Sequence, residues 1–72
     1  MQEQITMKRK ELESWLKERE RWFIDNGNPF QEATMVAYIQ KGLKKLHEMN
    51  LPEDKMIIMY DQDNQLMFKE EA

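Results

Sequence analysis

The sequence predicts an α+β fold in which an antiparallel helical hairpin is followed by a C-terminal two-stranded β-hairpin. Two long segments, about residues 6–25 and 29–49, carry apolar residues at the three- and four-residue spacings of amphipathic helices. After residue 52 the pattern changes to short apolar runs on either side of a polar turn, which is typical of paired strands. We expect all 72 residues to form a single domain.

The first helix is expected over about residues 6–25, a segment without proline or glycine. Thr6 stands where an N-cap would accept a main-chain hydrogen bond, and Ile5 stands where an apolar residue would pack under the first turn. Gly27 can adopt the left-handed conformation that ends a helix, so we expect the chain to reverse there. The apolar stripe of this helix comprises Leu12, Trp15, Leu16, Trp22 and Phe23.

The second helix is expected over about residues 29–49. Asn28 is a suitable N-cap, Pro29 suits the first helical position, and Gln31 follows the cap by three residues, which is a variant of the capping box. Asn50 can adopt a left-handed conformation at the end of the helix, and a proline soon afterwards prevents its continuation. Because only a short turn separates the two helices, we expect them to pack antiparallel.

A β-hairpin is expected over about residues 56–69, and two registers are compatible with its polar turn. A four-residue loop would direct one set of apolar side chains toward the helices, namely Ile57, Met59, Leu66 and Phe68. A three-residue loop with Asn64 in a left-handed conformation would shift the register by one residue and group Ile58, Tyr60, Leu66 and Phe68 instead. The sequence does not decide between the two registers.

The composition excludes several classes of protein. A domain of this size buries only about 60% of its unfolded surface, so it usually needs a covalent or metal staple, or a partner. Without cysteine there is no disulfide and no thiolate zinc site, and the single histidine, His47, cannot assemble a histidine-rich metal site. No apolar run approaches the roughly 20 residues that span a bilayer, and no secretory signal is present. We therefore expect a cytoplasmic protein.

The polar turn has the first three ligand spacings of a calcium-binding loop, at Asp61, Asp63 and Gln65. Such a loop needs glycine at its sixth position and glutamate at its twelfth, where this chain has Leu66 and Ala72. No serine or threonine lies in a glycine-flanked nucleophile elbow or in a glycine-rich phosphate loop. We therefore expect no metal, no cofactor and no catalytic residue, and the protein is not predicted to be an enzyme.

The apolar surface exceeds what one short chain can cover. Apolar side chains occupy more than one seam of the first predicted helix and both faces of the β-hairpin, and a two-stranded sheet is marginal alone. A symmetric homodimer is the commonest assembly, and either strand edges or helices could form it. Because aromatic side chains dominate interface energies, we expect the interface to contain Trp15, Trp22, Phe23, Tyr38, Ile58 and Tyr60.

Charge patterning allows two alternative functions. The net charge of −3 lacks the basic excess typical of nucleic-acid binding. A nucleic-acid-binding regulator would use the basic cluster Lys41, Lys44 and Lys45, with an affinity that falls steeply with salt. An acidic decoy that competes with nucleic acid for a basic host protein would use Glu53, Asp54, Asp61, Asp63, Glu70 and Glu71.

In its length, its lack of cysteine and its abundance of Lys, Glu, Met and Asn, the chain resembles small proteins of unassigned function carried by phages and prophages of low-GC Gram-positive bacteria. Many such proteins act by binding and redirecting a host protein, so the resemblance implies an interaction module. The function expected from the sequence is therefore that of a small non-catalytic protein–protein interaction module, a homodimer that binds or regulates another protein.

Overall fold

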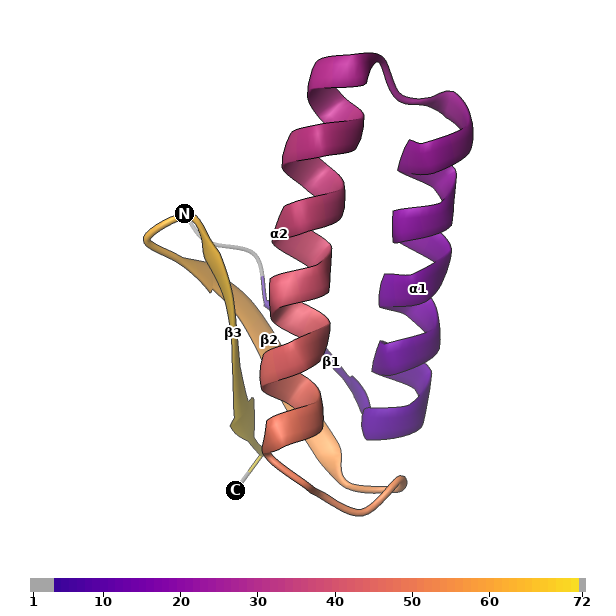
Figure 1. The fold of residues 1–72 in the computed structure, drawn as a ribbon. Coiled ribbons are helices and arrows are strands. Elements are labelled where there is room, and N and C mark those ends of the chain that lie inside the picture. Colours follow the sequence, from indigo (N-terminus) through magenta and orange to yellow (C-terminus); the bar gives the residue numbers. More distant parts are fainter. Residues whose placement is uncertain (1–3, 72) are drawn as a thin grey trace.

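The computed structural model describes residues 4–71, in which two helices pack against one face of a three-stranded antiparallel sheet (Figure 1). The elements are β1 (Ile5–Lys8), α1 (Arg9–Asn26), α2 (Pro29–Glu48), β2 (Met56–Gln62) and β3 (Gln65–Glu70). The strand order is β1-β2-β3. The α+β class and the antiparallel helical hairpin are confirmed, but the two-stranded C-terminal hairpin is incomplete, because a strand before the helices joins it.

The segment predicted as the start of the first helix is strand β1, so the assignment of Thr6 as N-cap is wrong. α1 begins at Arg9, whose N–H donates to the main-chain oxygen of Lys55 at 2.8 Å. The N–H of Lys10 donates to the main-chain oxygen of Glu53 at 3.1 Å. Because the loop before β2 satisfies these first helical N–H groups, α1 needs no capping side chain.

The turn between the helices has the predicted cap at Asn28 but not the predicted glycine conformation. Asn28 Oδ1 accepts a hydrogen bond from the Gln31 N–H at 2.8 Å, and Gln31 Oε1 accepts one from the Asn28 N–H at 3.3 Å, which completes the capping box. Gly27 is extended, with φ −75° and ψ 155°, rather than left-handed. Glycine suits the position because a Cβ atom would lie 2.7 Å from the main-chain oxygen of Phe23.

The hairpin between β2 and β3 has a two-residue turn, so both predicted loop lengths are wrong. Gln62 pairs with Gln65, and the residues between them, Asp63 and Asn64, have φ values of 54° and 60°. Positive φ at both positions is the conformation of the tight turn whose twist matches that of paired strands. The side chains that face the helices are those of the first predicted register, namely Ile57, Met59, Leu66 and Phe68.

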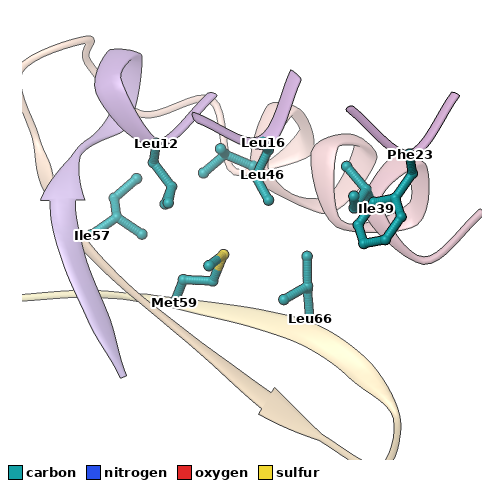
Figure 2. Close-up of a cluster of buried hydrophobic side chains, with 8 residues drawn as sticks. All are labelled: Leu12, Leu16, Phe23, Ile39, Leu46, Ile57, Met59 and Leu66. Atoms are coloured by element: carbon teal, nitrogen blue, oxygen red, sulfur yellow. The ribbon is translucent and has the colours of Figure 1, made fainter. Parts of the chain in front are cut away.

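The hydrophobic core lies between the helices and one face of the sheet (Figure 2). Leu12 and Leu16 from α1 and Leu46 from α2 are almost completely buried, and Ile57 of β2 points toward them. The whole cluster consists of Leu12, Leu16, Phe23, Ile39, Leu46, Ile57, Met59 and Leu66. No helix or strand of residues 4–71 covers the opposite face of the sheet.

Candidate functional site

The face of the sheet opposite the helices carries the side chains that alternate with the core residues. Along β2 the core residues are Ile57 and Met59, so Met56, Ile58 and Tyr60 point to the other side. The strand register carries the same alternation into β1 and β3. We call this surface the outer sheet face. It comprises Thr6 and Lys8 of β1, Met56, Ile58, Tyr60 and Gln62 of β2, and Gln65, Met67 and Lys69 of β3.

Ile58 lies at the centre of the outer sheet face. Its cross-strand partners are Thr6 of β1 and Lys69 of β3. Tyr60 and Met67 pair in the adjacent row, so apolar side chains from β2 and β3 adjoin one another. These apolar side chains are half-buried within the chain itself. An apolar strip on one face of a sheet is normally covered by a second layer of structure.

Lys69 places a positive charge over this apolar strip. Its Nζ lies 5.4 Å from the centroid of the Tyr60 ring, which is the geometry of a cation–π contact. Lys69 forms no salt bridge with any residue between 4 and 71. Lys69 is exposed at the surface of the sheet.

The β3 edge of the sheet is partly closed by Lys45 of α2. The Lys45 Nζ donates to Gln65 Oε1 at 2.6 Å and to the main-chain oxygen of Leu66 at 3.5 Å, and it lies 3.4 Å from the Met67 sulfur. A lysine over a strand edge hinders the addition of another strand. Lys45 is held by these contacts, whereas Lys41 and Lys44, the other two predicted nucleic-acid-binding lysines, are exposed.

The six predicted interface residues do not lie on one surface. Ile58 and Tyr60 lie on the outer sheet face. Trp15 and Tyr38 are half-buried against the core, between the helices and the end of the sheet. Phe23 is only 9% exposed and belongs to the core cluster, so it does not offer the free surface that the sequence predicted. Phe23 lies beside Ile39 of α2, the helix against which most of α1 packs (Figure 2).

Three large apolar side chains are exposed near the end of the helical hairpin, which projects beyond the sheet (Figure 1). Trp22 is 51% exposed there, Ile24 is 42% exposed and Phe30 is 78% exposed. We call these three residues the hairpin tip. Of them, only Trp22 was predicted from the sequence as an interface residue. Phe30 and Ile24 lie outside the apolar stripes of both helices, and that position is the signal that could have identified them.

A half-buried polar contact joins α2 to the end of β2. The Tyr38 hydroxyl donates a hydrogen bond to a carboxylate oxygen of Asp61. Burial raises the pKa of Tyr38 to about 12, and the hydrogen bond to Asp61 and its negative charge act in the same direction. Thr34, Met35 and Asn64 line the groove beside this pair. The contact therefore keeps the Tyr38 phenol protonated near pH 10, where an ordinary tyrosine is half ionised.

This contact predicts a loss of stability at high pH. Because the native pKa of Tyr38 lies above its ordinary value of 10.0, folding favours the protonated phenol. The contribution of this preference to the free energy of unfolding is complete below pH 10 and is lost as the pH rises toward about 12. We expect the denaturant midpoint of the wild type to fall across this interval. The Tyr38→Phe variant should lack this part of the fall, and its tyrosinate absorbance should lack the late titration step. Parallel curves for the two proteins would contradict the prediction.

The predicted acidic surface is dispersed. Asp54 forms an ion pair with Lys10 at 3.5 Å, and Glu70 forms one with Lys55 at 3.5 Å. Asp61 accepts the hydrogen bond from Tyr38, and its neighbour Asp63 lies in the β2–β3 turn. Within residues 4–71, no group of three or more His, Cys, Asp or Glu side chains is placed to hold a metal ion. Neither helix of the described chain is long and apolar enough to cross a membrane.

Comparison with known proteins assigns neither a family nor a function to this chain. No protein-family model matches the sequence. Searches of curated proteins and of solved structures likewise find no significant match.

Proposed function

We propose that this protein is a non-catalytic protein–protein interaction module and that the outer sheet face is its binding surface. The observation that carries the proposal is the apolar strip around Ile58 and Tyr60, which no helix or strand of residues 4–71 covers. Covering such a strip removes apolar surface from water, and this is the main favourable term in protein association. The resemblance to phage-borne proteins suggests a host or regulatory protein in the cytoplasm as the partner.

We also propose that the chain forms a homodimer, with the hairpin tip as the contact. Phe30 supports this proposal, because it is 78% exposed although it is large and apolar. A two-fold contact buries the same patch on both copies, and it leaves the outer sheet face free for another protein. Dimerisation by strand addition at β3 is less favoured, because Lys45 already occupies the main-chain oxygen of Leu66.

The binding surface is tested by comparing proteins captured from cells by tagged wild type and by two variants. Ile58→Glu places a charge in the apolar strip, while Gln40→Glu makes the same change in net charge at an exposed position on α2. We expect proteins captured by the wild type and by Gln40→Glu to be lost with Ile58→Glu. Circular dichroism must show that all three proteins are folded. The same captured set for all three would refute the outer sheet face as the binding surface.

The homodimer is tested by sedimentation equilibrium at tens of micromolar. We expect a dimer for the wild type and for Gln40→Glu, and a monomer for Phe30→Glu, because a dimer would bury the new carboxylate without a partner. A wild type that remains strictly monomeric would rule out the homodimer. A dimer that survives the Phe30→Glu change would rule out the hairpin tip as its contact.

A further inference from the structure

The charge of the outer sheet face is opposite to that of the whole chain. The chain has 11 Lys and Arg against 14 Asp and Glu, for a net charge of −3. The strand positions on the outer sheet face hold Lys8 and Lys69 and no acidic residue. Glu71 follows β3 and donates its N–H to the Met56 oxygen, so the alternation places this acidic residue at the border of the face, in the row of Lys8 and away from the centre. The centre of the face is therefore positive.

Lys69 occupies the part of the face that a partner must cover. It pairs with Ile58 across the strands, and its ammonium lies over the Tyr60 ring. A segment that covers Ile58 and Tyr60 removes water from this ammonium as well. Burying an unpaired ammonium is costly, whereas a carboxylate beside it forms a charge-assisted hydrogen bond. The position of Lys69 thus favours an occupant that carries a carboxylate next to its apolar contacts.

The dimensions of the face suit one helix. Adjacent strands lie about 4.8 Å apart, so three strands give a face roughly as wide as an α-helix, whose diameter is about 10 Å. The seven residues of β2 extend about 23 Å, which matches a helix of about 15 residues. The sheet already carries helices on its other face, and a helix here would complete a three-layer arrangement.

We infer that the outer sheet face binds an amphipathic helix of a partner protein, with acidic residues beside its apolar stripe. The inference rests on the proposed function and identifies the kind of partner. A second copy in face-to-face contact would bring like charges together, because each face carries Lys69. A nucleic acid would place phosphates against Met56, Ile58 and Met67, which offer no hydrogen-bond donor, and the face has a single aromatic ring for stacking.

The test uses two synthetic peptides of about 15 residues with the same leucine stripe, flanked by glutamate in one and by lysine in the other. Each is titrated into the full chain at low salt while the methyl resonances of Met56, Ile58 and Met67 are followed by NMR. We expect the glutamate peptide to shift these resonances and to bind about tenfold more tightly, as one charge-assisted hydrogen bond provides. Because the protein is acidic overall, non-specific attraction would favour the lysine peptide instead.

Two variants separate the role of Lys69 from general charge. Lys69→Met removes the ammonium from the outer sheet face, and Lys41→Met removes an exposed one from α2. We expect Lys69→Met to abolish most of the preference for the glutamate peptide and Lys41→Met to leave it unchanged. Equal losses in the two variants would overturn the inference.

Other outcomes would also overturn the inference. It would be overturned by equal affinities for the two peptides, or by resonance shifts confined to other residues. It would also be overturned if the methyl resonances shifted with protein concentration alone, which would reveal binding of a second copy. Displacement of the glutamate peptide by oligo-dT would overturn it as well. If neither peptide binds while Ile58→Glu still loses captured proteins, the inference fails and the proposed function stands. If Ile58→Glu loses no captured protein, the proposed function fails with it.

Discussion

Replacing Ile57 by alanine is expected to lower the free energy of unfolding by about 2–5 kcal/mol, whereas the same change at the next residue, Ile58, should cost less than about 1 kcal/mol. The two isoleucines are adjacent in β2 but point to opposite faces of the sheet. Ile57 is completely buried in the core beside Leu12, so its truncation leaves a cavity. Ile58 lies on the outer sheet face, where the smaller side chain leaves no enclosed space.

The measurement is urea-induced unfolding followed by circular dichroism. A domain of this size has little stability to lose, and Ile57→Ala can therefore unfold the chain altogether. Ile57→Val is the milder variant, with an expected cost of about 0.5–1.5 kcal/mol, and Ile58→Val is its matched control. Equal costs at the two positions would show that the outer sheet face is buried in solution and that the two faces are not distinguished as described.

The second helix is the part of the fold that the sequence predicts best, because its signals are local. Asn28 and Gln31 lie close enough in the chain to satisfy each other's main-chain groups, and they do so in the structure. The helix was predicted over about residues 29–49 and spans Pro29–Glu48. Asn50, predicted to be left-handed, has a φ of 52°.

Strand β1 could not be predicted with the same rules, because its stability depends on a distant part of the chain. It has four residues and joins α1 without a break, so it resembles a helix start. The alternation of Ile5 and Met7 with Thr6 and Lys8 is a strand signal, but four residues are too few to distinguish it from a helical pattern. Within residues 4–71, it is the pairing with β2 that makes this segment a strand.

The candidate site was predicted in part. Ile58 and Tyr60 were expected at an interface because the β2 segment is apolar on both faces, and the structure shows them on the outer sheet face. Lys69 was not identified, because its place beside Ile58 depends on the register, and both predicted loop lengths gave other pairings. Phe23, also expected at an interface, is buried in the core beside Ile39 of α2, because its helix packs mainly against α2.

Replacing Gly42 by valine is expected to destabilise the protein by about 2–3 kcal/mol, although valine has the higher helix propensity. Gly42 is buried in α2 at the point where that helix crosses β3. A Cβ atom there would lie 2.5 Å from Leu66 Cδ1 and 3.0 Å from Leu66 Cβ. A side chain at this position therefore requires either that Leu66 moves or that the helix and the sheet separate. Ala37→Val, at an exposed position of the same helix, should cost about 0.5 kcal/mol.

A double-mutant cycle with Leu66→Ala tests whether this contact sets the distance between α2 and β3. Leu66→Ala alone should cost about 2–5 kcal/mol, because it leaves a cavity next to Gly42. In the double variant the valine side chain occupies that cavity, so the combined cost should be smaller than the sum of the two single costs by about 1 kcal/mol or more. Strict additivity would mean that the two side chains do not compete for the same space. If Gly42→Val does not fold, Gly42→Ala serves instead. A glycine-to-alanine change at an exposed helical position stabilises a helix by about 1 kcal/mol. At Gly42 the contact of the new methyl group with Leu66 is expected to remove that gain.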